Sequence, residues 1–217
     1  DGETLNETTP FLINEDGVYV AGDDEKLASY PWVAQFNAAE GVLVLNNYNG
    51  GAISTAATGD LTIKLMGENT IFHEGIGIDI FGGNLTITAD AAATLDIQNI
   101  PAVDFSDEPY HCVGIANNFE GGYPDAEKSG DGVTITGYAA VSITSTKKLA
   151  NGTVNGIGAY GGVMVLGNAS LNIEAINNYT SLARGIYSFA GAIVINTTGE
   201  VNIAVSGEAS HDTGENV

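Results

Sequence analysis

Residues 156–174 read GIGAYGGVMVLGNASLNIE, and this stretch decides the fold. It contains a Gly-Ile pair, a glycine turn, the triplet Val163-Met164-Val165 and the triplet Leu171-Asn172-Ile173. In each triplet, aliphatic residues flank a middle residue of a different kind. This alternation of period two is typical of a β-strand with one buried face, and the triplets are too short to be helices. The stretch therefore predicts short strands joined by tight turns.

The same unit recurs along the chain. Gly-Ile pairs begin at residues 77, 114, 156 and 185, and a looser Ala52-Ile53 precedes them. Each pair opens a strand, and two triplets follow it, so a repeat holds three short strands separated by turns. Such a repeat predicts one coil of a solenoid, in which each coil bonds only to its neighbours. Stacked coils would align Leu85, Val133, Val163 and Ile193 in one interior column, with Ile87, Ile135, Val165 and Ile195 beside it.

Several segments of the sequence resemble those of a known protein family. YNGGAIS (48–54), LTIKLMGENTI (61–71), GIGIDIFGGNLTIT (75–88) and the opening stretch resemble bacterial secreted β-helix modules of the carbohydrate-binding and adhesin-like kind, within the pectate-lyase-like superfamily. The resemblance covers about residues 42–207 and concerns the scaffold. It implies an all-β, right-handed parallel β-helix with three short strands per coil, secreted or on a cell surface. No catalytic or ligand motif of the family matches residue by residue.

The first 41 residues lack the Gly-Ile repeat. Short apolar runs at 11–13, 18–20 and 32–36 predict irregular strands, and residues 21–30 predict a short helix that ends before Pro31. A solenoid needs a cover over its open end, where strand edges and core would otherwise meet water. We therefore expect a capping segment at 1–41 and the β-helix at 42–217, which together form one domain.

The amino-acid composition narrows the classes of partner and the cellular location that the protein can have. The chain of 217 residues is 44% hydrophobic and has 27 acidic against 6 basic residues, for a formal charge of −21. This charge disfavours nucleic acid and anionic membrane surfaces as partners and favours solubility and cation binding. No apolar run approaches the roughly 18 residues that a membrane span needs. With no hydrophobic leader before Asp1, we expect a secreted or cell-surface protein whose signal has been removed, without membrane insertion.

Two long loops hold the candidate metal ligands. Both are rich in carboxylates and belong to successive repeats, so stacking would bring them together. Ca²⁺ prefers six to eight oxygen ligands, which such loops can supply. A solvated acidic surface remains the alternative interpretation, because a chain of this charge has acidic residues in most loops. The candidate ligands are Asp104, Asp107, Glu108, Asp125, Glu127 and Asp131.

The same loops carry aromatic and amide residues. Aromatic rings stack on sugar rings, and amides and carboxylates bond sugar hydroxyls, so these loops are candidates for binding a polysaccharide or a host or cell-surface glycan. The alternative is that the rings pack the loops onto the solenoid. The candidate sugar-binding residues are Tyr110, Asn117, Asn118, Phe119 and Tyr123.

Catalysis finds little support. Glycoside hydrolysis needs two suitably spaced carboxyl groups, and the abundance of acidic residues makes that signal weak. A calcium-dependent polysaccharide lyase would need a base near the carboxylates, for which Lys128 is the best candidate, and its plainer role is that of a solvated counter-ion. Zinc spacing, a P-loop and a GxSxG motif are all absent from the sequence. We therefore predict a binding protein rather than an enzyme.

A structural role is the remaining alternative. The outward positions change from Thr86 and Thr134 to Met164 and Val194, which predicts an apolar stripe on the late coils. In this alternative the chain self-associates as a surface or filament subunit, through this stripe or through the C-terminal coil. The lone Cys112 stands in the segment HCVGI (111–115), beside aliphatic core positions, where a small buried thiol is the ordinary interpretation.

Overall fold

The computed structural model describes residues 11–14, 17–20, 33–37, 39–55, 59–99, 111–120, 123–124, 131–147, 153–177 and 182–207. All regular structure in these ranges is β-strand, as the alternating triplets predicted. No helix of this part of the chain is long and apolar enough to cross a membrane.

Three sheets of nine, six and five strands form the body of the protein, and a two-stranded hairpin lies beside them. We call the three sheets A, B and C. Sheet A contains β1 (Phe11–Asn14), β2 (Gly17–Val20), β3 (Ala34–Asn37), β4 (Val42–Asn46), β7 (Leu61–Met66), β10 (Leu85–Thr88), β15 (Val133–Ile135), β18 (Val163–Gly167) and β21 (Ile193–Thr197). Sheet B contains β5 (Asn49–Gly50), β8 (Glu68–His73), β11 (Ala93–Asn99), β16 (Ala139–Lys147), β19 (Ser170–Asn177) and β22 (Val201–Gly207). Sheet C contains β6 (Ile53–Thr55), β9 (Ile76–Ile80), β12 (Cys112–Asn117), β17 (Val154–Ala159) and β20 (Ala183–Ser188), and the hairpin is β13 (Phe119–Glu120) with β14 (Tyr123–Pro124).

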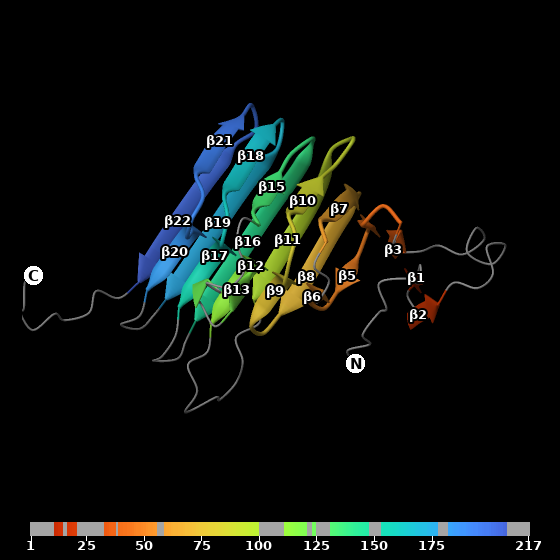
Figure 1. Ribbon diagram of the computed structural model, residues 1–217, viewed down its shortest axis with the longest axis horizontal. Coiled ribbons are helices and arrows are strands. Elements are labelled where there is room, and N and C mark those ends of the chain that lie inside the picture. The colour runs from red at the N-terminus through yellow and green to blue at the C-terminus, as the bar shows by residue number, and fades with distance from the viewer. Residues whose placement is uncertain are drawn as a thin grey trace, which may run out of the picture.

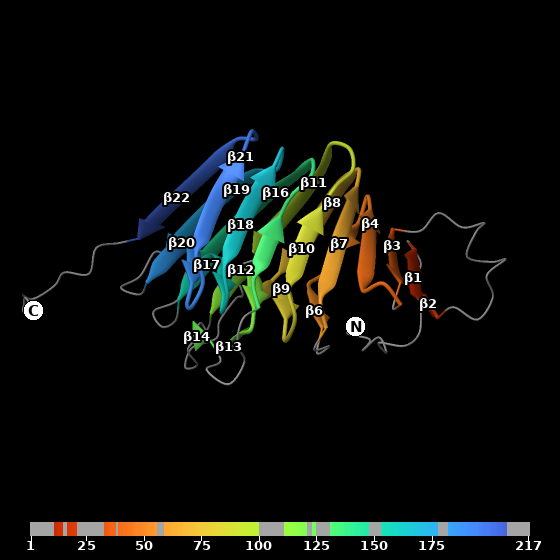
Figure 2. The ribbon, with the colours of Figure 1, turned by 45° about the horizontal axis from the view of Figure 1, so that its top comes forward.

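The chain visits the sheets in a repeating order. From β4 onward it passes through A, B and C in turn, and each new strand pairs in parallel with the previous strand of the same sheet. Figures 1 and 2 show the result, in which the strands lie side by side and the colour advances steadily along the stack. This arrangement is a β-solenoid-like fold.

The register confirms the predicted interior columns. Leu85 pairs with Val133, Val133 with Val163, and Val163 with Ile193. The neighbouring column from Ile87 to Ile195 follows the same pairing. Side chains of both columns are fully buried as far as β18, because alternation turns each aliphatic residue of a triplet toward the same interior.

The glycines of the Gly-Ile pairs have a packing role. Gly77, Gly114, Gly156 and Gly185 lie on sheet C, and at each of them a Cβ atom would collide with the Cγ2 methyl of an isoleucine on sheet B. The four isoleucines are Ile97, Ile143, Ile173 and Ile203, one for each successive strand from β11 to β22. Sheets B and C therefore approach so closely that only glycine fits opposite each methyl group.

The N-terminal strands differ from the rest of the stack. β3 pairs antiparallel with β4, and β1 pairs antiparallel with both β2 and β3, so they extend sheet A beyond the first parallel strand. Strands were expected in this region. The helix predicted at residues 21–30 lies outside the described residues.

Asparagine and glycine shape the corners between sheets. Asn47 has φ of 53° and Asn118 has φ of 50°, a left-handed conformation that asparagine tolerates better than most residues with a Cβ atom. In the next coil, Gly67 takes the position of Asn47 with φ of 67°, and Asn47 Oδ1 accepts a hydrogen bond from the Glu68 backbone N–H at 3.1 Å. A left-handed residue at this corner lets the chain turn from sheet A into sheet B.

Candidate functional site

A column of polar side chains runs across the outside of sheet B. It consists of Asp96 on β11, Ser142 on β16, Asn172 on β19 and Asn202 on β22, which pair with one another in register. Each is the middle residue of a triplet whose aliphatic neighbours point inward, so alternation places all four on the outer face. The column crosses four strands along the axis of the stack.

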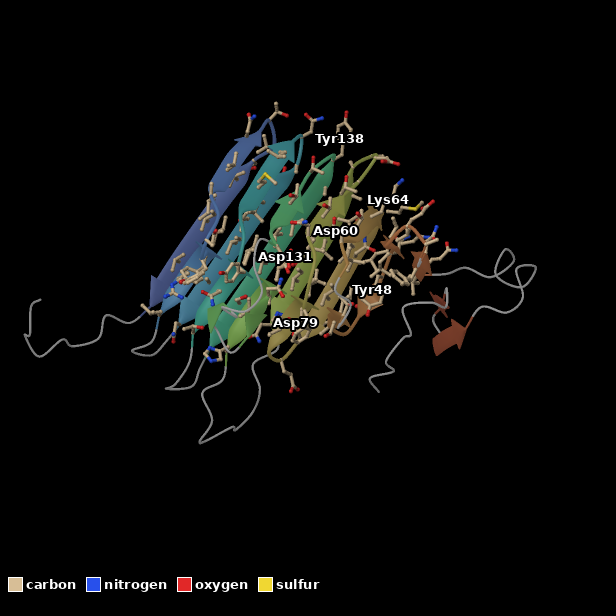
Figure 3. The ribbon with its side chains drawn as sticks, viewed as in Figure 1. Tyr48, Asp60, Lys64, Asp79, Asp131 and Tyr138 are labelled. Atoms are coloured by element: carbon tan, nitrogen blue, oxygen red, sulfur yellow. The ribbon has the colours of Figure 1, made fainter. Side chains whose placement is uncertain are left out.

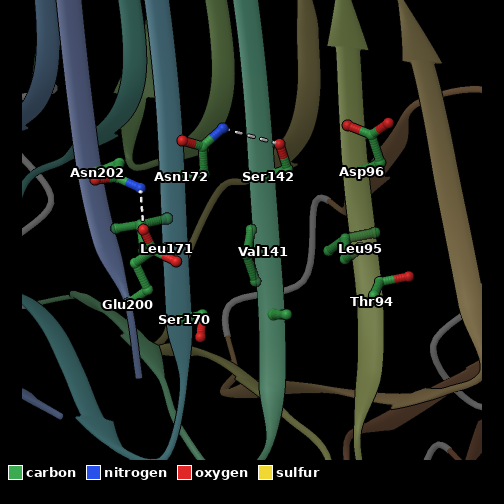
Figure 4. A pocket seen from close by; sticks show the side chains of 11 residues that line it. Thr94, Leu95, Asp96, Val141, Ser142, Ser170, Leu171, Asn172, Glu200 and Asn202 are labelled. Atoms are coloured by element: carbon green, nitrogen blue, oxygen red, sulfur yellow. Dashed lines mark hydrogen bonds between the residues drawn. The ribbon is translucent and has the colours of Figure 1, made fainter. Parts of the chain in front are cut away.

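The sheet is hollowed along this column, as Figure 4 shows. The hollow has a volume of about 330 Å³ and spans the same four strands. Its middle carries the small residues Ala140, Ser142 and Ser170, on β16 and β19, which leave room between the larger side chains on either side. Asp96 on β11 borders one side of the hollow, and Glu200, directly before β22, borders the other. We call this hollow the sheet B groove. Its lining residues are Thr94, Leu95, Asp96, Ala140, Val141, Ser142, Ser170, Leu171, Asn172, Glu200 and Asn202.

Hydrogen bonds within the groove hold its side chains in place. Asn172 Nδ2 donates to Ser142 Oγ at 3.4 Å, and Asn202 Nδ2 donates to Glu200 Oε1 at 2.9 Å. Gln98 Nε2 donates to Asp96 Oδ2 at 2.5 Å. A carboxylate has about four acceptor sites, so both acidic side chains retain capacity for hydrogen bonds to a ligand.

The groove is acidic. Asp96 and Glu200 are its charged residues, whereas the two basic side chains that the structure describes are engaged elsewhere. Lys64 Nζ lies 2.6 Å from Asp90 Oδ2, and the Arg184 guanidinium lies 4.3 Å from the centroid of the Tyr187 ring. The described surface therefore favours a neutral or cationic ligand over an anionic one.

The spacing of the two groove carboxylates bears on hydrolysis. Adjacent strands are about 4.8 Å apart, and three such steps separate β11 from β22, so the two side chains start on the order of 14 Å apart. Glycoside hydrolases hold their two carboxyl groups roughly 5–9.5 Å apart. The pair of Asp96 and Glu200 therefore suits ligand contact better than hydrolysis.

Three of the residues singled out in the sequence lie together at a corner between sheets C and A. Asn118 Nδ2 donates to Asp131 Oδ2 at 2.5 Å, and the Gly83 backbone N–H donates to the same oxygen at 3.1 Å. The neighbouring Asn117 Nδ2 donates to the carbonyl oxygens of Gly83 and Gly132. Both asparagines are buried, so in this arrangement their side chains join the coils to one another.

Asp60 lies beside this corner (Figure 3). Its Oδ1 accepts bonds from the backbone and side-chain N–H groups of Asn84, whose own Oδ1 accepts the Gly132 backbone N–H. Asn117 Oδ1 and Asn118 Oδ1 are buried without a hydrogen-bond partner. Among the residues with described side chains, no group of three or more His, Cys, Asp or Glu is placed to hold a metal ion.

The remaining predicted site residues are not placed in detail. Phe119 and Tyr123 belong to the hairpin of β13 and β14, where Phe119 pairs with Pro124 and Glu120 with Tyr123, and their side chains lie outside the described part. The others lie wholly outside the described residues: Asp104, Asp107, Glu108, Tyr110, Asp125 and Glu127.

An aromatic pair that the sequence analysis missed lies at the same kind of corner. The rings of Tyr160 and Phe189 have centroids 5.3 Å apart, and Phe189 is 52% exposed. Each ring stands four residues after the glycine of a Gly-Ile pair. Alignment of the repeats therefore predicts that the two rings lie in neighbouring coils. The sequence gives no comparable signal for the groove, because its polar column consists of the middle residues of the second triplets, which are ordinary solvent-facing positions of a strand.

Comparison with known proteins places the chain in no family. No family model, no curated protein and no solved structure matches it.

Proposed function

We propose that the protein is an extracellular or cell-surface module that binds carbohydrate or mediates adhesion, and that the sheet B groove is its contact surface. The observation that carries the proposal is the ordered polar column of Asp96, Ser142, Asn172 and Asn202 along the groove. Hydroxyl, amide and carboxylate groups on a fixed sheet match the hydroxyl groups of a sugar, which both donate and accept hydrogen bonds.

The geometry of the groove favours an extended glycan. The polar residues recur at every strand, about 4.8 Å apart, which is comparable with the length of one sugar ring in a chain. A linear polysaccharide lying along the stack would therefore meet a similar set of groups at each ring. Asp96 and Glu200 favour a neutral or amino-sugar glycan, because an acidic chain would be repelled unless cations bridged the charges.

The proposal includes the finer architecture, a right-handed parallel β-helix with three strands per coil. It is supported by the regular order of the sheets along the chain and by the strong preference of parallel crossover connections for the right hand. The resemblance to secreted β-helix modules of the pectate-lyase-like superfamily fits the same architecture.

Calcium is proposed as an aid to binding. Asp131 stands at the border of a long acidic loop, beside the amide group of Asn118, so it can join carboxylates of that loop around a cation. Thermal unfolding in calcium and in chelator tests this proposal, because an ion that binds only the native state raises the melting temperature. The Asp131→Asn variant should lose most of any calcium-dependent rise.

The groove itself is tested by binding to a panel of neutral, amino-sugar and acidic polysaccharides. We expect Asn172→Ala and Asp96→Ala to weaken binding of the best ligand about tenfold or more, which corresponds to about 1.4 kcal/mol. Thr134→Ala is the matched control, because Thr134 occupies the outer face of sheet A on the same coil as Ser142. Wild-type affinity in both groove variants would refute the proposed contact surface.

A further inference from the structure

Tyr138 is an exposed aromatic residue at the edge of the sheet B groove. It directly precedes β16, at the turn where the chain passes from sheet A into sheet B (Figure 3). Its side chain is 52% exposed. The coil to which it belongs lies in the middle of the stack and has neighbouring coils on both sides. The exposure of the ring therefore does not result from an uncovered end of the solenoid.

Alternation along β16 places Tyr138 on the same face as the groove. Ala139 and Val141 are buried in the core, whereas Ala140 and Ser142 point outward and line the groove. Tyr138 comes one residue before Ala139 and so belongs to the outward set. Along the strand it lies about 7 Å from Ala140, which is a distance that an aromatic side chain can span. The ring thus flanks the middle of the groove, where the small residues leave room.

The backbone of Tyr138 is held in place by the preceding coil. Its N–H group donates to the Ala89 carbonyl oxygen at 2.9 Å, and its own carbonyl oxygen accepts the Ala93 N–H at 3.5 Å. Gly137, with φ of 67°, makes the turn before it. An aromatic side chain has few rotatable bonds, so a ring on a fixed backbone loses little conformational freedom when it binds a ligand.

The Tyr138 side chain does not take part in the hydrogen bonds or ring contacts of the described residues. Asn168 holds the equivalent place in the next coil, two residues before Ser170, and its Oδ1 accepts a bond from Thr198 Oγ1 at 2.8 Å. Substitution of an exposed side chain without such contacts usually changes stability by less than about 0.5 kcal/mol. The ring therefore has no evident role in the fold.

We infer that Tyr138 is the stacking residue of the sheet B groove and that its ring packs against the face of a β-1,4-linked, gluco-configured sugar. The inference rests on the proposed function of the groove. In such a sugar every ring hydroxyl is equatorial, so both ring faces carry C–H groups, which pack favourably on the electron-rich face of an aromatic ring. A sugar ring held in this way directs its edge, and with it the hydroxyls, toward Ser142 and Asn172.

Tyr138 and Asp96 then have separable roles. Stacking depends on the shape of the sugar ring and is insensitive to salt. Attraction between the Asp96 carboxylate and an amine is screened by salt. A chain of β-1,4-linked glucosamine meets both groups, whereas the same chain of glucose has the ring faces without the amines.

The first test measures binding of two soluble probes, cellohexaose and the β-1,4-linked glucosamine hexamer, to the full chain by isothermal titration calorimetry. We expect Tyr138→Ala to weaken both probes by a similar factor, about fivefold to tenfold. Asp96→Ala should weaken the glucosamine hexamer more than cellohexaose. Added salt should reduce the effect of Asp96→Ala and leave that of Tyr138→Ala unchanged.

Three variants separate stacking from other contributions of the side chain. Tyr138→Phe keeps the ring and should bind like the wild type, whereas Tyr138→Leu keeps apolar bulk without a flat face and should bind like Tyr138→Ala. Phe189→Ala is the matched control, because Phe189 is also 52% exposed but lies between β20 and β21, at a corner of sheets C and A. It should bind both probes like the wild type. Circular dichroism checks that each variant is folded.

A spectroscopic signature provides a second measurement. Tyr138→Trp retains an aromatic face, and its tryptophan emission, after subtraction of the wild-type spectrum, should shift to shorter wavelength when cellohexaose is added. An unchanged spectrum at saturating probe would contradict stacking.

The outcomes distinguish this inference from the proposed function. Weakened binding in Asn172→Ala together with wild-type binding in Tyr138→Ala would overturn the inference and keep the groove as the contact surface. Wild-type affinity in Tyr138→Leu would show a general apolar contact in place of stacking. Failure of the wild type to bind either hexamer, with binding of another polysaccharide, would overturn the gluco-configured ligand while the groove variants still test the contact surface.

Discussion

A Cβ atom on Gly77 would lie 2.6 Å from the Cγ2 methyl of Ile97 and 2.7 Å from the Gly114 carbonyl oxygen. Carbon atoms in contact are normally about 3.5–4.0 Å apart, so the methyl group of Ile97 occupies the space that any larger residue at position 77 would need. This relationship recurs in every later coil, and it sets the distance between sheets B and C.

Gly77→Ala should therefore destabilise the protein. Overpacking of a well-packed core typically costs about 1–3 kcal/mol, and the rigid backbone of Gly114 limits relaxation here. The measurement is the free energy of unfolding by denaturant titration. Gly51→Ala is the control, because a Cβ there meets nothing within 4 Å. Ile97→Leu removes the Cγ2 methyl, so in a double-mutant cycle it should recover part of the loss, and strict additivity would show that the two residues do not clash.

His73 should make stability depend on pH. Burial lowers the pKa of His73 from 6.5 to about 4, an effect that a backbone hydrogen bond with Gly75 partly offsets. Between these two values the unfolded chain binds a proton that the native protein does not, so the free energy of unfolding falls as the pH falls from 6.5 to 4. The full shift corresponds to about 3 kcal/mol.

Between pH 5 and 6.5 the contribution of His73 to the free energy of unfolding can be measured separately from that of the carboxylates, since most carboxylates titrate below pH 5. Denaturant titrations of the wild type and of His73→Leu across this window should give different slopes, with the variant nearly flat. His211→Asn controls for the loss of a histidine elsewhere. Parallel slopes for wild type and His73→Leu would show that His73 does not remain neutral in the native state.

Asp131 should contribute more to stability than a surface aspartate. Asp131→Ala removes the acceptor of the Gly83 N–H and of the Asn118 amide, and buried donors left without a partner cost about 1–3 kcal/mol. Asp90→Ala breaks the exposed pair with Lys64, for which about 0–1 kcal/mol is expected. Comparison of the two variants by thermal and denaturant unfolding tests the corner network, and equal losses would contradict it.

Cys112 should be unreactive in the folded protein. It is the single cysteine of the sequence, is 1% exposed and lies on β12 of sheet C. A thiol reagent reaches such a side chain only when the structure opens, so labelling should be slow in buffer and complete in denaturant. Fast labelling under native conditions would show that this coil opens locally.

The sequence predicted the parallel columns because burial on one face demands strict alternation. A shift of one residue would turn Leu85 and Val133 outward, so the interior aliphatics determine the register. The same alternation says nothing about strand direction. For that reason the strands near Phe11 and Phe36 were expected, whereas their antiparallel pairing with sheet A was not predicted.

The groove was harder to predict. Asp96, Ser142, Asn172 and Asn202 appeared in the sequence as ordinary solvent-facing residues, and only the stacking of four strands makes them a column. The hollow depends on the sizes of residues from different coils, such as Ala140 beside Ser170. The burial of Asn117 and Asn118 was also beyond local patterns, because their partners, the Gly83 and Gly132 carbonyls and the Asp131 carboxylate, come from other segments of the chain.

The change from antiparallel to parallel pairing at β4 also bears on the order in which the strands form during folding. β3 and β4 pair residues as near as Asn37 and Val42, whereas the first parallel pair joins Val42 to Thr62 and the next joins Leu61 to Leu85, which are more distant in sequence. The entropy lost on closing a loop grows with its length, so the antiparallel contacts form at the smallest cost. We expect these N-terminal hairpins to nucleate, and each coil then to be templated by the edge of the one before it.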